Sequence, residues 1–328
     1  MRSARLELAL ESGAFALPPL GGVLVLRPRE GDDLSALPRD RVVVRTGFRP
    51  DHDAFAAAGW QVAGDGPFAA AVVCLPRARA AALALIAEAL AAVPAGAPVL
   101  LDGQKTDGIE PAIKACRAAG LAMGEVLSKA HGKAVVLTAA APPAGWAAFR
   151  TEVEGGFVTG PFCFSADGPD RGSALLAAAL PAKLPARMAD FGAGWGYLAR
   201  AVLEQPGVAE LDLIEAEAKA LDCARANIAD TRARFQWADV TAFKPARLYD
   251  AIVMNPPFHV ARSADPDLGL AFIRAAHRWL TPSGTLWLVA NRHLPYDRTL
   301  ATLFREVQDI GGDAVFRLTR AALPLRAR

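Results

Sequence analysis

A glycine-rich turn is the stretch of this sequence whose residue types are best suited to ligand chemistry. The stretch reads MADFGAGWGYLARAVLE and runs from Met188 to Glu204. Asp190 ends an apolar run that predicts a strand, and the residues after the turn predict a helix. Because Gly192, Gly194 and Gly196 carry no Cβ atoms, a ligand can approach this backbone closely.

The spacing of these glycines favours one class of cofactor. The pattern is GxGxG, whereas dinucleotide-binding turns carry GxGxxG. An acidic residue at the end of the strand suits an amino-acid-like cation better than a pyrophosphate. The pattern therefore favours S-adenosylmethionine over NAD, although glycine spacing alone also fits a turn that binds nothing.

Two further acids follow at the ends of the next predicted strands. Glu215 lies about twenty residues after the turn, where a carboxylate accepts the ribose hydroxyls in nucleotide-binding α/β folds. Asp239 follows a third strand, where we expect it to reach an adenine amine. Each acid taken singly is better explained as a solvated helix cap. In series after the glycine turn, they predict a bound nucleoside.

A strand that ends at two prolines supplies the candidate catalytic group. The stretch reads DAIVMNPPFHVAR, and proline cannot continue a ladder. The side-chain oxygen of Asn255 and the carbonyl of Pro256 can accept the two protons of an sp2 amine, which localises its lone pair for attack on a sulfonium methyl group. Pro257 stiffens the loop, and Phe258 is placed to stack on a planar base. The alternative is an ordinary strand end. No cysteine lies near this loop, which disfavours covalent attack on a pyrimidine carbon.

The elements that position these residues alternate between short β-branched runs and Ala/Leu-rich helical stretches, which indicates an α/β fold with a mostly parallel sheet. A stretch rich in Pro, Gly and small residues separates two such halves, so we expect a domain at 1–140, a linker at 141–156 and a second domain at 157–328. The expected strands are 22–26, 41–45, 71–75, 98–101, 133–138, 187–191, 210–214, 234–237, 250–254, 285–290 and 314–318.

The two halves resemble each other. Strand, helix, Pro, Gly, strand and polar turn follow in the same order after AAVVCLP in the first half and after DAIVMNPP in the second. The first half has no glycine-rich turn after its first strand. We therefore predict two copies of one fold, of which only the second is equipped for chemistry.

Five motifs in the second half carry a resemblance to a known family: FSADGPDRGSALLAAALP, ADFGAGWGYLA, LIEAEAKALDCARANI, NPPFH and ANRHLPY. In this order they resemble the bacterial ribosomal RNA guanine-N2 methyltransferases, particularly the small-subunit enzyme. DGQKTDGI and SKAHGK in the first half resemble the degenerate N-terminal domain of that family over a shorter and less specific match.

The resemblance implies two tandem Rossmann-like class I methyltransferase domains, the N-terminal one degenerate, with an antiparallel last strand. It implies S-adenosylmethionine as donor and guanine N2 of 16S ribosomal RNA as target. The degenerate domain is expected to serve RNA recognition or structural support. The implied catalytic positions are Asn255, Pro256, Pro257 and Phe258. The implied cofactor positions are Phe164, Ser165, Asp190, Gly192, Ala193, Gly194, Glu215, Ala216, Asp239, Val240 and Asn255.

Bulk properties limit the other classes of function. The net charge is only +2, which neither identifies nor opposes a nucleic-acid binder. Four widely spaced cysteines without a CxxC pair indicate neither a metal site nor a disulfide framework. No stretch reads as a secretory signal or a membrane span. We expect a cytoplasmic monomer without metal that acts on ribosomal RNA or the small ribosomal subunit.

Scattered basic residues are candidates for phosphate contacts, because such contacts need only positioned cations. A solvated surface explains them equally well. The candidates are Lys105, Lys129, Lys133, Arg262 and Arg292, together with the histidines His259 and His293.

Three alternatives remain open at the level of sequence. A protein glutamine-N5 methyltransferase also uses an Asn-Pro-Pro loop, but that family usually carries Tyr where this chain has Phe258. A DNA adenine methyltransferase is disfavoured because no separate target-recognition segment is visible. A non-catalytic RNA-binding or assembly protein would also retain the folds.

Overall fold

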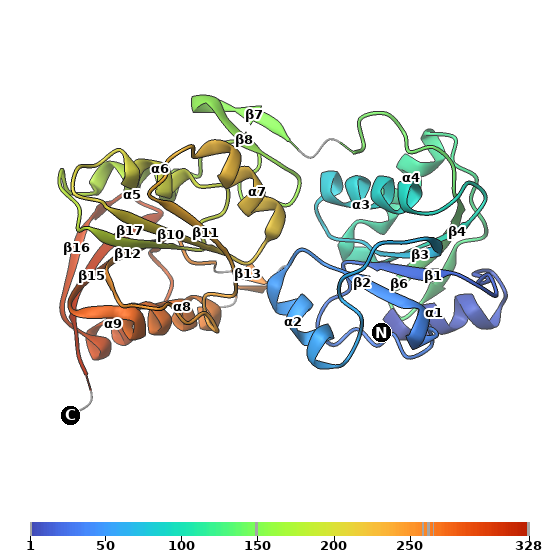
Figure 1. Cartoon of the computed structure of the whole chain (residues 1–328), viewed down its shortest axis with the longest axis horizontal. Coiled ribbons are helices and arrows are strands. Elements are labelled where there is room, and N and C mark those ends of the chain that lie inside the picture. The colour runs from blue at the N-terminus through green and yellow to red at the C-terminus, as the bar shows by residue number, and fades with distance from the viewer. Residues whose placement is uncertain (1, 148–149, 258, 261–262, 265, 327–328) are drawn as a thin grey trace. The chain divides into compact units, whose positions relative to one another are not determined.

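The structure is a computed structural model that describes residues 2–147, 150–257, 259–260, 263–264 and 266–326 (Figure 1). The chain divides into two compact units, Met1–Phe149 (unit 1) and Arg150–Arg328 (unit 2). Within the segment expected to be a linker, residues 151–156 form β7 (Thr151–Val153) and η3 (Glu154–Gly156), which belong to unit 2. In the described part of the chain, no helix has the length and apolar character needed to cross a membrane.

Unit 1 contains one six-stranded sheet with the order β2-β1-β3-β4-β6-β5. The first four strands in this order are parallel, whereas β6 runs antiparallel to both β4 and β5. Its elements are α1 (Arg2–Glu11), β1 (Gly22–Leu26), η1 (Arg39–Arg41), β2 (Val42–Arg45), α2 (Arg49–Ala57), β3 (Phe68–Cys74), α3 (Arg79–Ala92), β4 (Pro98–Gln104), η2 (Lys105–Asp107), α4 (Ile109–Ala118), β5 (Leu127–Lys129) and β6 (Gly132–Thr138).

Unit 2 contains a seven-stranded sheet with the order β11-β10-β9-β12-β15-β17-β16. The strands from β11 to β15 are parallel, and β17 runs antiparallel to β15 and β16, which confirms the expected antiparallel last strand. Its further elements are β8 (Phe157–Thr159), α5 (Arg171–Ala179), β9 (Arg187–Phe191), α6 (Tyr197–Leu203), β10 (Glu210–Glu215), α7 (Ala218–Asn227), β11 (Ala233–Trp237), β12 (Tyr249–Met254), β13 (His259–Val260), β14 (Ser263–Ala264), α8 (Pro266–Trp279), β15 (Leu280–Asn291), α9 (Asp297–Leu303), β16 (Phe304–Gly312) and β17 (Phe316–Pro324).

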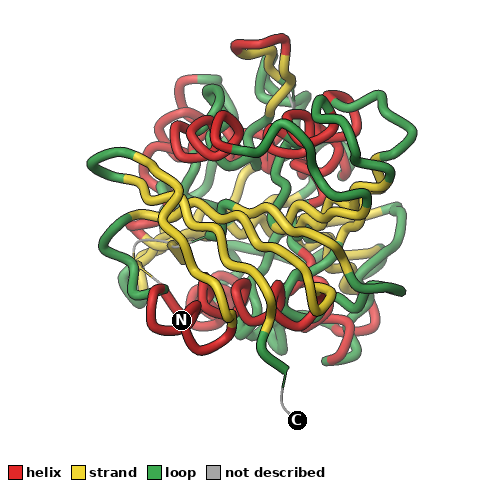
Figure 2. Tube along the Cα trace, turned by 90° about the vertical axis from the view of Figure 1, so that its left-hand side faces the viewer, coloured by secondary structure: helices red, strands yellow, loops and turns green. Residues whose placement is uncertain are grey.

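Helices cover both faces of the sheet in unit 2, so the strands are buried on both sides (Figures 1 and 2). One core joins α5, α6 and α7 to the sheet through residues such as Leu176, Leu198 and Leu221. The other core joins α8 and α9 through Phe272 and Leu300. This arrangement is the α/β fold with tandem Rossmann-like units that the strand and helix pattern predicts.

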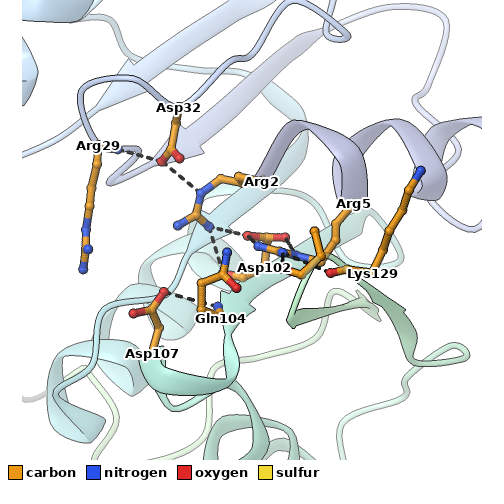
Figure 3. Close-up of polar contacts among 9 residues, drawn as sticks. Arg2, Arg5, Arg29, Asp32, Asp102, Gln104, Asp107 and Lys129 are labelled. Carbon is orange, nitrogen blue, oxygen red and sulfur yellow. Dashed lines mark hydrogen bonds and ion pairs between the residues drawn. The ribbon is translucent and has the colours of Figure 1, made fainter. Parts of the chain in front are cut away.

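A buried ion network lies at the carboxyl end of β4 in unit 1. Arg2 and Arg5 reach from α1 to Asp102, which accepts from Arg5 Nε at 2.6 Å and from Arg5 Nη2 at 2.9 Å (Figure 3). Arg2 also pairs with Asp102, and its Nε donates to Asp32 at 2.9 Å. Arg5 is fully buried and Arg2 nearly so, hence the two guanidinium groups stay buried only because the carboxylates neutralise them.

Candidate active site

The glycine turn after β9 adopts a backbone that only glycine adopts freely. Gly192, Gly194 and Gly196 have φ of 76°, 54° and 92°. A Cβ on Gly196 would lie 2.9 Å from Ile228 Cδ1, so that glycine is needed for packing. A Cβ on Gly194 would meet no atom within 4 Å. The middle of the turn therefore faces open space, as a ligand cradle requires.

Asp190 is a buried carboxylate without a protein partner. It is 1% exposed, and neither side-chain oxygen has a hydrogen-bond donor among the described residues. Burial and the nearby Glu215 carboxylate raise the pKa of Asp190 to about 8, and the backbone amide of Ala199, which lies outside hydrogen-bonding geometry, offsets them only in part. An orphaned buried acid is expensive, so its presence beside an open turn indicates a site built for a cation.

Glu215 shapes the turn as well as facing it. Its Oε2 accepts from the backbone N–H of Gly194 at 2.8 Å, and its Oε1 accepts from the backbone N–H of Glu217 at 2.7 Å. Burial raises the pKa of Glu215, and these two amides act in the opposite direction. Each oxygen retains a lone pair that can accept a ligand hydroxyl.

The register of the sheet brings the site together. Phe191 of β9 lies opposite Ile214 of β10 on one side and Met254 of β12 on the other. The next residues along the three strands are Gly192, Glu215 and Asn255, so all three emerge at one edge of the sheet. Two strand spacings separate Glu215 from Asn255 across the turn, about 10 Å.

Asn255 is held in one orientation by two neighbours on α5. Its Nδ2 donates to Asp170 Oδ2 and to Ser173 Oγ, each at 2.9 Å. Asp170 is also the N-cap of α5, since the same oxygen accepts from the Ser173 amide at 2.8 Å. No described residue donates to Asn255 Oδ1. The amide oxygen is therefore left as an acceptor at the sheet edge.

The rest of the predicted Asn-Pro-Pro-Phe loop is described only in part. Pro256 is buried and Pro257 is half-buried. Phe258 and Arg262 lie outside the described residues, as does the side chain of His259. The stacking expected of Phe258 therefore stays a prediction.

Asp239 follows β11 and closes a local turn. Its Oδ1 accepts from the Thr241 amide and its Oδ2 from the Thr241 hydroxyl, both at 2.8 Å. This is a local side-chain turn and not the helix cap that the sequence offers as the alternative, because no helix lies between β11 and β12 in the described chain. Val240 is buried in the core, and the carbonyl of Ala216 accepts from Trp237 Nε1 at 2.9 Å. A contact between Asp239 and an adenine amine would use its remaining lone pairs.

Phe164 and Ser165, two of the implied cofactor positions, lie next to the glycine turn. Trp195 Nε1 donates to the carbonyl of Phe164 at 2.9 Å, and Ser165 Oγ donates to the carbonyl of Gly168 at 2.7 Å. Ser165 has φ of 50°, a conformation that is rare outside glycine. The ring of Phe164 is 61% exposed, so it is open to a ligand at the rim of the turn.

Sequence reasoning missed Asp170 and Ser173, the residues that orient Asn255, and Asn227, which supports the turn from behind. Asn227 Nδ2 donates to the carbonyls of Trp195 and Val158, each at 2.8 Å. The DRGS stretch carries an N-cap signal, which predicts a helix start but not the partner of that cap. Asn227 carries no signal of its own, because its role depends on tertiary contacts.

The basic residues singled out in the sequence differ in their surroundings. Lys133 pairs with Glu110 at 2.8 Å, and Arg292 donates to the carbonyl of Asp313 at 2.6 Å. Lys105 and Lys129 are exposed and form no ion pair with a described residue. Within the described ranges, no group of three or more His, Cys, Asp or Glu side chains is arranged to hold a metal ion.

Comparison with known families places the chain. Residues 154–320 match the model of the methyltransferase small domain, which is about half of the chain and nearly all of unit 2. This chain belongs to the methyltransferase small domain family. The glycine turn, the three acids and the Asn-Pro-Pro loop of this family member all lie within the matched residues.

Two curated relatives extend the comparison. The chain is 32% identical over 272 residues to the ribosomal RNA small subunit methyltransferase C of Chromohalobacter salexigens, which covers 78% of each chain. It is 34% identical over 164 residues to the ribosomal RNA large subunit methyltransferase G of Ectopseudomonas mendocina, covering 48% of this chain and 44% of the relative. In this second comparison, and in one with the ribosomal RNA small subunit methyltransferase C of Shewanella amazonensis, the chain spans about half the length of the curated relative.

One solved structure matches this methyltransferase family member along nearly its whole length. It is the T. thermophilus 16S rRNA N2 G1207 methyltransferase RsmC in complex with AdoMet and guanosine. The TM-score is 0.79 at 24% sequence identity, and the match covers 98% of this chain and 91% of the other. The likeness shows that both units share the class I methyltransferase fold of that protein.

Proposed function

We propose that the chain transfers a methyl group from S-adenosylmethionine to the exocyclic N2 amine of a guanine in 16S ribosomal RNA. The observation that carries the proposal is the Asn255 amide, whose nitrogen is held by Asp170 and Ser173 and whose oxygen is left as an acceptor beside the glycine turn. The same reaction is supported by the relative, a ribosomal RNA small subunit methyltransferase, and by the T. thermophilus structure, a 16S rRNA N2 G1207 methyltransferase.

The residues around the turn suit the donor. The orphaned Asp190 carboxylate is suited to the α-amino group of the methionine part, and the open backbone at Gly194 admits its chain. The free lone pairs of Glu215 are suited to the ribose hydroxyls. When bound, the donor supplies an electrophilic methyl group on a sulfonium.

Asn255 prepares the acceptor nitrogen. The lone pair of guanine N2 is delocalised into the ring, which makes it a poor nucleophile. Asn255 Oδ1 and the Pro256 carbonyl accept the two N–H groups, which favours the geometry in which the lone pair is available. The hydrogen bond from Nδ2 to the Asp170 carboxylate raises the electron density on Oδ1 and strengthens it as an acceptor. The nitrogen loses one proton to water after it gains the methyl group.

The remaining assignments follow from the same reaction. Unit 1 would serve RNA recognition or structural support, because it retains the fold without the glycine turn. The ribosomal RNA substrate implies a cytoplasmic location. We infer that the enzyme acts as a monomer on ribosomal RNA or the small ribosomal subunit.

A second candidate is guanine methylation in 23S ribosomal RNA. It is favoured by the 34% identity to a ribosomal RNA large subunit methyltransferase over 164 residues. The chemistry at Asn255 would be the same, and only the RNA partner would differ.

The two candidates separate in one methyl-transfer experiment. The purified chain and labelled donor are incubated in parallel reactions, each with one candidate substrate. The candidates are small subunits, large subunits, free 16S RNA and release factors. We expect N2-methylguanosine in 16S RNA, identified by mass spectrometry of the nucleosides. Label in 23S RNA would favour the second candidate, and label only on protein would support glutamine methylation. Failure of the wild type to bind the donor at millimolar concentration would indicate a non-catalytic RNA-binding protein.

A further inference from the structure

A cavity in unit 2 lies at the opposite end of the strands from the glycine turn. Its volume is about 300 Å³, and its lining includes the charged residues Arg187, Asp212, Arg234, Lys244 and Arg247. Arg187 is the first residue of β9, whereas the turn follows the last residue of that strand. A strand of this length spans about 13 Å, so the cavity is separate from the methyl-transfer site.

The cations of this cavity exceed the acids that contact them. Glu210 is the one carboxylate that pairs with the three arginines in the described structure, with contacts of 3.1 Å to Arg247, 3.5 Å to Arg234 and 3.9 Å to Arg187. Only the first of these contacts has hydrogen-bonding length. Lys244 has no ion-pair partner among the described residues. A third carboxylate, Asp250, accepts from the backbone N–H of Arg187 at 3.3 Å. Four cations thus lie beside three carboxylates, which leaves a local charge of +1.

Asp212 is committed elsewhere. The hydroxyl of Tyr249 donates to Asp212 Oδ2 at 2.6 Å, and Tyr249 is fully buried. The guanidinium of Arg187 lies 5.6 Å from the centre of the Tyr249 ring. Asp212 and Arg187 therefore both contact Tyr249, and they form no ion pair with each other.

Arg187 itself carries an unused donor. Its side chain is 14% exposed, and its buried Nε has no hydrogen-bond partner within the described chain. An unpaired buried N–H of a cation is costly, and a guanidinium is matched by oxyanions that accept two parallel hydrogen bonds. The Arg187 guanidinium thus borders the cavity with hydrogen-bonding capacity that no described residue uses, which suits it to bind an anion.

We propose that this cavity binds a phosphate group through Arg187, Arg234, Lys244 and Arg247. A phosphate supplies the negative charge that this cluster of cations lacks and offers paired acceptor oxygens to its guanidinium groups. The phosphate has two possible sources, the backbone of the RNA substrate or a free phosphate or nucleotide. The proposal concerns binding alone and does not depend on the methyl-transfer reaction.

The test uses the full chain with Arg234→Gln and Lys244→Gln combined, since both side chains lie at the surface and outside the methyl-transfer site. The matched control combines Arg298→Gln and Arg305→Gln, which remove the same charge from exposed positions of unit 2 away from the cavity. Circular dichroism melts establish that all three proteins are equally folded.

Two titrations distinguish the sources. One measures inorganic phosphate and AMP binding by calorimetry, and the other measures a fluorescein-labelled RNA hairpin at several salt concentrations. An RNA phosphate predicts that the cavity variant binds RNA about tenfold more weakly and that the slope of log K against log salt falls by about 1. A free phosphate predicts loss of inorganic phosphate or AMP binding with an unchanged RNA slope. Equal behaviour of cavity variant, control and wild type in both titrations would overturn the proposal.

Discussion

The two sheets of this chain have the same strand order apart from one edge. In unit 2 the order is β11-β10-β9-β12-β15-β17-β16, and in unit 1 the order β2-β1-β3-β4-β6-β5 reproduces it from β10 onward with the same parallel and antiparallel pairs. At the edge where unit 2 has β11, the described part of unit 1 has no strand and only a single parallel bridge between Val43 and Gln61. The edge of the sheet that β11 forms in unit 2 is thus reduced to one residue pair in unit 1, while the other six strands keep their order.

The ends of the first strands differ most. In unit 2, β9 is followed by the glycine turn and α6. In unit 1, β1 is followed by Arg27 and a long loop without a counterpart of α6 among the described residues. Asp190 of β9 has no hydrogen-bond partner among the described residues, whereas β1 of unit 1 carries no acid. The buried acid of unit 1, Asp102, lies on another strand, β4, and is neutralised internally by Arg2 and Arg5 (Figure 3). Unit 1 therefore keeps its sheet without a counterpart of the open turn or of its unpaired acid.

The largest expected effect concerns that network. Asp102→Ala leaves two buried guanidinium groups without their shared carboxylate, which should destabilise unit 1 by about 3–5 kcal/mol. Hydrogen exchange of the β4 amides measures this change locally. Asp53→Ala, which removes the exposed partner of Arg49, should cost under about 1 kcal/mol. Equal protection of β4 in the two variants would contradict the importance given to Asp102.

The next effect concerns the acceptor group of unit 2. Asn255→Ala should reduce methyl transfer by about 10²–10³-fold while donor affinity changes little, because the amide acts on the substrate nitrogen. Single-turnover assays and donor calorimetry separate the two quantities. Ser173→Ala removes one of two partners of Nδ2 and should have a smaller effect. A parallel loss of donor binding and turnover in Asn255→Ala would refute its assigned role.

A glycine substitution compares the two units directly. Gly194→Ala and Gly31→Ala both place a Cβ in open space at positive φ, so each should destabilise its unit by about 1 kcal/mol. Only Gly194→Ala fills space that the donor needs, so it should weaken donor binding roughly tenfold or more. Calorimetry on both variants tests the difference, and a donor affinity at Gly194→Ala equal to that at Gly31→Ala would place the donor elsewhere.

Another effect on stability is a pH dependence that comes from Asp190. Its pKa is raised from 3.8 to about 8 in the fold, so the folded state keeps a proton that the unfolded state releases. The free energy of unfolding should therefore fall as pH rises between about 4 and 8, by at most about 1.4 kcal/mol per pH unit, and level off above 8. Urea unfolding of wild type and Asp190→Asn measures it. The variant should lack this slope, and an identical slope in both would exclude Asp190 as its source.

Donor binding should show the opposite trend. A cationic amino group favours the ionised Asp190 carboxylate, so binding below about pH 8 releases a proton and affinity rises with pH. Calorimetry in buffers of different ionisation enthalpy counts that proton. Binding without proton release at pH 7 would contradict this assignment.

The buried strands could be predicted from the sequence because their apolar runs do not depend on the rest of the fold. β1 and β9 have the predicted bounds, and β12 begins one residue earlier than expected. β16 was not predicted, because it is an edge strand with mostly exposed, charged residues and carries little hydrophobic signal. The predicted strand at 314–318 was misplaced in part, since β17 runs from Phe316 to Pro324.

Of the candidate site, only the residues at the ends of strands could be predicted from the sequence. Asp190, Glu215 and Asn255 follow apolar runs, and sheet register then places them at one edge. The orientation of the Asn255 amide depends on Asp170, which is 85 residues earlier in the chain. Such a contact has no local pattern, so it needs the folded chain. The cationic cavity was missed for the same reason, because its arginines come from separate strands and a loop.

Asn227 has a consequence for how fast the site can be occupied. Its side-chain oxygen accepts from the Val158 N–H, and its nitrogen donates to the carbonyls of Val158 and Trp195. These bonds hold the glycine turn in its shape without a ligand. Little ordering entropy then remains to be lost on binding. We expect the association rate of the donor to be governed by diffusion into the turn, with no slow conformational phase.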